Sequence, residues 1–425
     1  MYAPGDTQEE IDRDLGFVAD DPWPSEALRT WRPSSPSRAN RALVWTAIVV
    51  GASVALLGVI QLFSMWFRTL LPGSVLSPPV SPPTSAGRSP PMQTLPPPRG
   101  PRSDALIRTL QSGPDPTWRP VFAEPVDPLA DDDLHLALYL CYELHYRGIE
   151  GVDDALEWDP QLLSFRAQLE SPFERALRRA TDSTSPRATA SRVVTDELQE
   201  LATQDSRPSL SRYLAREAKL EEFVEFVIQR SLYTLKEADP HSFVIPRLDG
   251  AAKTALLEIQ SDEYGGGRPD RMHAAIFARS MCALGLDDTY GAYLHAVPGS
   301  TLATVNLVSF LSLHRRLRGA AMGHLALFEL TSSVANRRYG NGLRRLGFGP
   351  AATDYYDEHV EADAVHDTIA THDVVGQLVR EEPALAGDVL FGARALALLE
   401  ERFAAGLLQQ WRARRSAIDR PRIPA

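Results

Sequence analysis

The feature of this sequence that most constrains its fold is the uncharged run at residues 42–67, between Arg41 and Arg68. The run reads ALVWTAIVVGASVALLGVIQLFSMWF, with Trp45 and Trp66 near its ends. About 20 apolar residues suffice for a helix to cross a bilayer, and aromatic residues favour the two interfaces. A buried core helix is the alternative, but a core helix this long and this unpatterned is unusual. We therefore predict a transmembrane helix over residues 41–68.

The residues before this span predict its role and orientation. A polar tail of residues 1–40 precedes the span, and no small-residue cleavage site follows it, so the span is predicted to be an anchor and not a signal peptide. The positive-inside rule places the N-terminus in the cytoplasm and the rest of the chain outside. Four arginines precede the span closely and one follows it: Arg29, Arg32, Arg38, Arg41 and then Arg68.

A proline-rich segment follows the span. Residues 72–101 contain eleven prolines, including PPVSPP and LPPPRGP. Such a stretch favours a semi-extended polyproline conformation over helix or sheet. We predict a Pro-rich disordered linker over residues 69–117 that lifts a domain off a membrane. A ligand for a proline-recognition domain is the alternative.

Composition excludes several classes of protein. The chain has 44 basic and 55 acidic residues and a net charge of −11, which argues against nucleic acid as a partner. Two cysteines, Cys141 and Cys282, cannot form a disulfide framework or a thiolate metal site. A hydrophobic content of 44% predicts a folded domain, which we place at residues 118–425.

Apolar residues in that domain recur at helical spacing, and no segment alternates strictly as a strand would. The sequence therefore predicts an all-α bundle, preceded by the one transmembrane helix and the linker. Helices are expected at 131–146, 220–238, 251–264, 273–285, 354–372 and 384–415, with two more within 302–334.

One predicted helix carries a pattern typical of a metal site. His359, Asp363 and His366 are spaced i, i+4 and i+7, so they fall within about 60° of one another on one helical face. Two imidazoles and a carboxylate are suitable ligands for a first-row metal. A solvated acidic face is the alternative interpretation, because several other acidic residues crowd the same helix.

Two further segments add possible ligands. Glu237 ends an apolar helix just before Pro240, and Glu263 ends another, with His273 ten residues later. Carboxylates at the ends of apolar helices are costly if buried alone and favourable around a cation. Helix capping or surface exposure would explain each of them equally well. The glycines at 265–267 are predicted to break the helix between Glu263 and His273.

The chain from about 205 to 375 resembles the haem-oxygenase-like diiron oxidases, also called iron-containing redox enzymes. That family has a Glu on one core helix, Glu and His ten positions apart on the next, and His-x3-Asp-x2-His on a third. The matching residues here are Glu237, Glu263, His273, His359, Asp363 and His366. The segments HSFVIPRL, DEYGGGRPDRMH and DEHVEADAVH are similar to the actinobacterial branch.

The resemblance implies a haem-oxygenase-like helical bundle that binds two Fe²⁺ ions through these six residues; Mn²⁺ suits the same ligands. It implies an enzyme that activates O₂ to oxidise a small organic substrate and needs an electron donor. Membrane anchoring through residues 42–67 is not part of the family pattern. Two alternatives are a haem-binding protein of the same fold and a non-catalytic, membrane-tethered binding module.

Other residues receive more ordinary predictions. Tyr233, Phe243, Met322 and Phe328 are candidates for the lining of a water-poor substrate pocket. Glu143 and His145 point to different faces of one helix and are predicted to be structural. Glu329 lies in an apolar helix and could be an additional carboxylate near the metals, whereas His241, His324 and His372 have no matching spacing.

Overall fold

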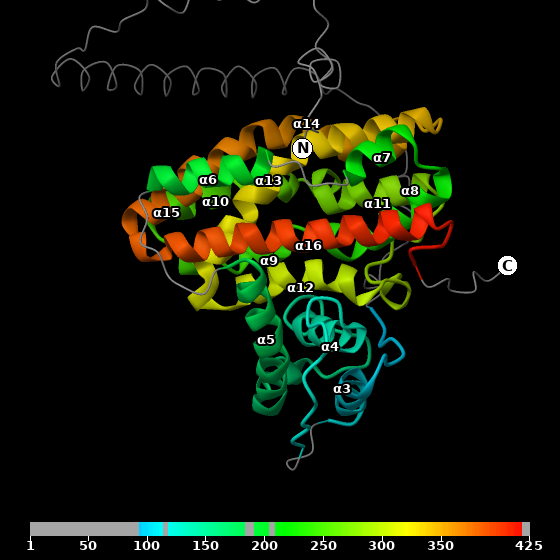
Figure 1. The fold of residues 1–425 in the computed structure, drawn as a ribbon, viewed down its shortest axis with the longest axis vertical. Coiled ribbons are helices and arrows are strands. Elements are labelled where there is room, and N and C mark those ends of the chain that lie inside the picture. Colours follow the sequence, from blue (N-terminus) through cyan, green and yellow to red (C-terminus); the bar gives the residue numbers. More distant parts are fainter. Residues whose placement is uncertain (1–92, 114–117, 183–190, 204–208, 419–425) are drawn as a thin grey trace, which may run out of the picture. The chain divides into compact units, whose positions relative to one another are not determined.

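The computed structural model describes residues 93–113, 118–182, 191–203 and 209–418. Within these ranges the chain forms α-helices, short 3₁₀ turns and one π-helical segment, and no strand (Figure 1). The predicted all-α class is therefore confirmed for the described part of the chain.

The helices pack into a bundle in which α16 runs along one side and the short group α3, α4 and α5 lies next to α12 (Figure 1). In chain order they are α3 (Pro101–Ser112), α4 (Asp132–Glu143), α5 (Pro160–Ala180), α6 (Ser191–Thr203), α7 (Leu210–Arg216), α8 (Leu220–Thr234), α9 (Asp239–Ser242), α10 (Gly250–Glu263), α11 (His273–Ala283), α12 (Gly299–Leu313), α13 (Arg318–Arg345), α14 (Pro350–Thr368), α15 (Gly376–Glu381) and α16 (Ala386–Arg412).

The helices expected from periodicity are present with ends shifted by a few residues, except that α13 continues 11 residues beyond the predicted end at 334. The 302–334 segment divides as predicted, because His314 adopts an extended conformation (φ −103°, ψ 112°) between α12 and α13. The helix predicted at 354–372 begins earlier, as α14, and continues into a π-helix at Ile369–Val375. Helices α5, α6 and α7 were not among the predicted segments.

Glycines at two positions let α13 and α16 approach closely. A Cβ on Gly323 would lie 1.9 Å from the Val389 carbonyl oxygen, and one on Gly392 would lie 1.8 Å from the Ala320 carbonyl oxygen. No larger side chain fits such a crossing, because real Cβ contacts are far longer. This crossing packs α13 against α16, while α13 also packs along α14.

The predicted disordered linker over 69–117 is wrong for the residues that the structure describes. Helix α3 forms there and packs on α4. Asp133 caps it from a distance: its Oδ1 accepts from the Ser103 amide at 2.8 Å, and its Oδ2 accepts from the Arg102 amide at 2.9 Å. Free amides at a helix N-terminus need such acceptors, and Asp133 is too far along the chain to be recognised as this cap.

The predicted membrane span, the polar tail and the rest of the predicted linker lie outside the described residues. Among the helices of the described part, none is both long enough and apolar enough to cross a bilayer.

Candidate metal centre

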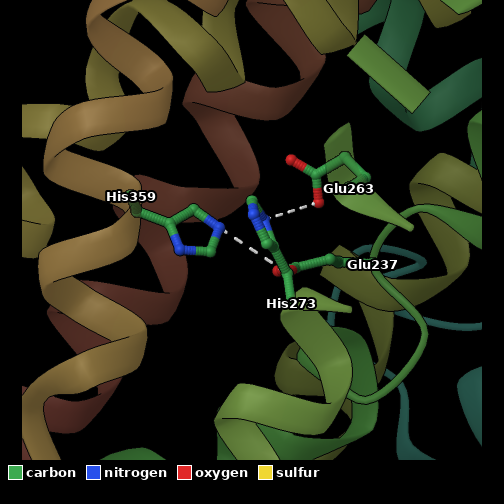
Figure 2. A group of neighbouring side chains, drawn as sticks. All are labelled: Glu237, Glu263, His273 and His359. Carbon is green, nitrogen blue, oxygen red and sulfur yellow. Dashed lines mark ion pairs between the residues drawn. The ribbon is translucent and has the colours of Figure 1, made fainter. Parts of the chain in front are cut away.

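The side chains of the candidate site come from helix ends and from one continuous helix face. Glu237 lies in the turn between α8 and α9, where Pro240 starts α9. Glu263 is the last residue of α10, and His273 is the first residue of α11. His359 belongs to α14. Residues far apart in the sequence thus meet where these helices converge (Figure 2).

The glycine turn between α10 and α11 sets the positions of Glu263 and His273. Gly265 has φ +72°, a conformation that L side chains rarely adopt. A Cβ there would also lie 2.6 Å from the backbone carbon of Arg271. The glycine break predicted between the two residues is therefore confirmed, and across it His273 Nδ1 lies 3.0 Å from Glu263 Oε2.

The motif on α14 faces inward. His359, Asp363 and His366 are 3%, 1% and 3% exposed, whereas Val365 on the outer face is 58% exposed. The acidic neighbours of the motif point elsewhere: Glu358, for example, forms an ion pair with Arg271 at 2.6 Å. The interpretation of the three residues as a solvated face is therefore wrong.

Four residues form the first half of the cluster (Figure 2). Ligand atoms of Glu237, Glu263, His273 and His359 all lie within 4.8 Å of one another. His359 Nε2 is 3.6 Å from Glu237 Oε1, and His273 Nδ1 is 3.0 Å from Glu263 Oε2. His273 Nδ1 is also 3.9 Å from Glu237 Oε1.

The second half of the cluster surrounds His366. Its Nδ1 lies 3.9 Å from Glu263 Oε1, 3.8 Å from Glu329 Oε2 and 3.9 Å from Asp363 Oδ1. Glu263 therefore belongs to both halves, with one oxygen facing each. All six residues predicted from the sequence lie together, and with Glu329 they make up what we call the histidine–carboxylate cluster.

Contacts outside the cluster orient its members. His359 Nδ1 donates to the Tyr355 carbonyl at 2.8 Å, which turns Nε2 toward Glu237. His366 Nε2 donates to Asp262 Oδ2 at 3.0 Å, which turns Nδ1 inward. The Tyr355 hydroxyl donates to Glu237 Oε2 at 2.7 Å. Metal-binding histidines are typically held in this way by a second hydrogen bond.

Several inward-facing atoms have no hydrogen-bond partner among the described residues. They are Glu237 Oε1, both oxygens of Asp363, and His366 Nδ1. Buried polar atoms without partners are rare in proteins because each costs about 1–3 kcal/mol. The unpartnered atoms are of the nitrogen and oxygen types that iron accepts, so the cluster fits a cation that would satisfy them together.

Electrostatics inside the cluster follow from the burial of like charges. Burial raises the pKa of Glu329 well above its usual range, and the carboxylates of Asp363 and Glu263 act in the same direction. Burial opposes a charge on His359, but the carboxylate of Glu237 outweighs it and raises the pKa of this imidazole well above its usual value. Without a cation the cluster therefore keeps protons, which metal binding would release.

Comparison with known proteins agrees with this donor set. Residues 224–401 match the family model described as iron-containing redox enzyme. Residues 224–401 of this chain are therefore similar to that family. The matched residues include the whole histidine–carboxylate cluster, so the predicted resemblance is confirmed. The roles of the individual cluster residues as ligands stay predictions.

The chain is also similar to two individual proteins. Over 147 residues the chain is 28% identical to nitrosourea synthase from Streptomyces achromogenes subsp. streptozoticus, covering 34% of this chain and 31% of that protein. The chain thus matches about a third of the length of this relative. A domain of unknown function with a heme oxygenase-like fold from Shewanella denitrificans OS217 aligns with a TM-score of 0.41 and 14% identity, over 53% of this chain and 93% of that chain.

The described part of the chain has a cavity of about 530 Å³ beside the cluster. Tyr233 and Phe328 line both this cavity and the small space between the cluster residues. Two of the four predicted lining residues are therefore found there. Met322 and Phe243 are not: Met322 is fully buried in the core, and Phe243 packs edge-on against Tyr146.

Sequence reasoning left two residues of the site without a firm role. Glu329, predicted as a possible additional carboxylate, is 5% exposed and borders the second half of the cluster. His241 lines the small space beside Glu237, and burial lowers its pKa to about 4. In the sequence, Glu329 was marked as a lone acid in an apolar helix, whereas no matching spacing marked His241.

Proposed function

We propose that this chain is a non-haem diiron oxidoreductase that activates O₂ to oxidise a small organic molecule. The observation that carries the proposal is the set of buried, unpartnered nitrogen and oxygen atoms that converge around Glu263. One metal position would use Glu237, Glu263, His273 and His359. The other would use Glu263, Glu329, Asp363 and His366.

Charge balance supports two divalent ions. Glu237, Glu263, Glu329 and Asp363, when ionised, carry four negative charges, equal in size to the charge of two Fe²⁺ ions. A carboxylate shared by two metals about 3.5–4 Å apart is common in two-metal sites, and Glu263 faces both halves of the cluster. Mn²⁺ is the alternative metal for this donor set.

The chain's own residues would prepare the site for oxidation. Two ferrous ions held there would supply electrons for the reduction of O₂. Tyr355 and the main chain orient Glu237 and His359, while Tyr233 and Phe328 form an apolar wall between the cluster and the larger cavity. Such a wall would exclude water, so that the substrate and not solvent is oxidised.

Iron content of the full-length chain tests the proposal. The metal-free protein would be loaded anaerobically with Fe(II) beside His359→Ala and Asp363→Ala, with His372→Ala and Asp367→Ala as matched controls on the same helical segment. We expect about two irons per chain in the wild type and both controls, loss of iron in the two site variants, and O₂ consumption that depends on iron.

The other outcomes separate the alternatives. Tight iron without O₂ consumption would indicate a non-catalytic metal-binding module, whereas a Soret band after addition of haem would indicate haem binding. A fully iron-loaded His359→Ala variant would contradict the role proposed for α14.

We also propose that residues 42–67 anchor the enzyme in a membrane, with the N-terminus in the cytoplasm and the helical domain outside. The uncharged run and the arginines before it support this. The expected result is that the full chain stays in the membrane fraction after alkaline carbonate washing, and that protease added outside the cell digests the helical domain. Release by the wash would refute anchoring; protection from protease would refute the orientation.

A further inference from the structure

The larger cavity has an unusual distribution of charge. Its walls come mainly from α7, α8, α13, α14 and α16, and among its described lining residues only Arg230, Glu400 and Glu401 are charged. Glu401 is exposed to solvent. The charge that a bound molecule would meet inside the cavity therefore comes from Arg230 and Glu400.

Arg230 and Glu400 neutralise each other. Arg230 Nη1 donates to Glu400 Oε1 at 2.8 Å, and Nη2 donates to Oε2 at 2.5 Å. The two side chains are 19% and 30% exposed, so the pair is shielded from most of the solvent. The guanidinium also lies 4.3 Å from the ring centre of Phe403. Bidentate pairing of this kind joins two of the five guanidinium N–H donors to the two oxygens of the carboxylate.

A charged ligand would have to break this pair. A carboxylate that took Arg230 would leave Glu400 without its partner, and an ammonium that took Glu400 would leave Arg230 without its partner. An uncompensated charge in a largely buried site is strongly unfavourable. The remaining polar lining, such as Ser209, Thr234 and Asn336, can bond neutral hydroxyl or carbonyl groups.

Aromatic rings make up a large part of the cavity lining. Phe226 and Tyr339 have ring centroids 4.7 Å apart, and Phe277 and Tyr355 have centroids 4.9 Å apart. Because these rings pack on one another, they present a preformed surface to a ligand. Planar apolar groups stack favourably on such rings, face to face with an offset or edge to face.

From these contacts we propose that the cavity binds an uncharged small molecule with an aromatic body, and that the Arg230–Glu400 pair excludes charged analogues. The proposal deepens the proposed function and rests on it for the identification of this ligand as the substrate. Binding itself needs only the cavity.

Three probes with the same ring system and different charge test the proposal on the full-length, metal-free protein. They are 2-naphthalenemethanol, 2-naphthoate and 2-naphthylmethylammonium, with affinities measured by titration calorimetry. We expect the neutral alcohol to bind at least tenfold more tightly than either ion. Equal or tighter binding of an ion, or failure of the alcohol to bind, would overturn the proposal.

Variants of the ion pair make the test specific. Glu400→Gln leaves Arg230 without its partner, so the affinity for 2-naphthoate should rise at least tenfold relative to the affinity for the alcohol. Arg230→Gln leaves Glu400 without its partner, so the affinity for the ammonium probe should rise instead. If one of these variants fails to fold, the other still tests the proposal, because each leaves one member of the pair without its partner. Unchanged discrimination between the three probes in a folded variant would contradict the proposal.

Ala397→Phe separates this proposal from the proposed function. Ala397 lines the cavity on α16, so a phenyl ring there should fill the space and weaken all three probes at least tenfold, while iron content stays that of the wild type. Unchanged probe binding in this variant would mean that the probes bind elsewhere. A wild-type protein that binds the alcohol but no iron would refute the diiron function and leave the cavity assignment intact.

Discussion

Two buried clusters of charged side chains lie close together in this chain and differ in whether their charges are compensated by hydrogen-bonded partners. The first, which we call the paired cluster, consists of Glu143, Lys236 and Tyr290. Lys236 Nζ donates to Glu143 Oε2 at 2.8 Å, and the Tyr290 hydroxyl lies 2.7 Å from Glu143 Oε1. The second is the histidine–carboxylate cluster, which begins at the next residue, Glu237.

The difference distinguishes buried charges that stabilise the fold by pairing with each other from buried groups that could bind a ligand. Glu143 and Lys236 are 0% and 1% exposed and compensate each other, with the ammonium also 4.3 Å from the Tyr146 ring centre. In contrast, Glu237 Oε1 and both oxygens of Asp363 accept no hydrogen bond within the described part of the chain, and their histidine neighbours lie 3.6–3.9 Å away. Burial is similar in the two clusters, so unsatisfied bonding capacity is the feature that separates them.

The largest expected effect comes from breaking the paired cluster. Glu143→Gln leaves the charge of Lys236 uncompensated and should lower the free energy of unfolding by about 3–5 kcal/mol. Glu329→Gln is the matched control, because its raised pKa keeps Glu329 protonated and the amide mimics that form. The control should change stability by less than about 0.5 kcal/mol. Urea denaturation of the metal-free proteins measures the free energy of unfolding of both variants. Equal losses of stability in Glu143→Gln and Glu329→Gln would contradict the proposed difference between the two clusters.

Added iron should stabilise the protein through the histidine–carboxylate cluster and not through the paired cluster. At an Fe(II) concentration 100 times the dissociation constant, the wild type should gain about 2.7 kcal/mol in free energy of unfolding. Asp363→Asn should lose most of this gain, whereas Glu143→Gln should keep it despite its lower starting stability. A gain of the same size in Asp363→Asn would show that iron binds outside the histidine–carboxylate cluster. Anaerobic urea denaturation with and without Fe(II) provides the comparison.

The pH dependence of the metal-free protein should reflect the raised pKa values of His359 and His273. Each of these rings keeps its proton in the folded state after the unfolded chain has lost it near pH 6.5. Their stabilising contribution is complete below pH 6.5 and is lost as pH rises through the folded-state pKa. The raised pKa of Glu329 acts with the same sign.

The free energy of unfolding should therefore fall between pH 6.5 and 8.5, by about 1.4 kcal/mol for each unit by which one such pKa is raised. Thermal melts at several pH values measure the slope. His372→Ala should leave the slope unchanged, and iron loading should reduce it, because bound metal replaces the protons. Stability that rises over this range would contradict the assigned protonation.

The smallest expected effect concerns orientation within the cluster. Tyr355→Phe removes the hydroxyl that donates to Glu237 Oε2 but keeps the ring. One such bond contributes about 1 kcal/mol, so iron affinity should fall roughly fivefold. Tyr356→Phe, the neighbouring buried ring on α14, should have no effect. Competition with a calibrated iron chelator gives the iron affinity of both variants. Equal affinities would show that the Tyr355 hydroxyl does not support iron binding.

Sequence periodicity predicted the parts of the site that depend on local geometry. The spacing of His359, Asp363 and His366 on one helix placed them on a common face, and the glycines after Glu263 marked the turn toward His273. Glu143 and His145 were predicted to be structural, which their pairing with Lys236 and Glu157 confirms.

Tertiary contacts account for what local pattern did not determine. Glu329 borders the cluster because α13 packs along α14, and no spacing within α13 encodes that contact. Folding of α3 depends on capping by Asp133, 30 residues from Ser103, so its proline-rich surroundings suggested a disordered linker. The carboxylate that pairs with Lys236, Glu143, lies 93 residues away in the sequence, so no local pattern predicts that this lysine is buried.

The hydrogen bonds that hold His359 and His366 from outside the cluster differ in how readily a mutation can remove them. His359 is held by the carbonyl of Tyr355, a main-chain atom that every amino acid carries. His366 is held by the side chain of Asp262, which is 60% exposed and can be replaced by a single point mutation without disturbing the core. Natural variation can therefore adjust the orientation of His366 through position 262, whereas the orientation of His359 is inherited with the backbone of α14.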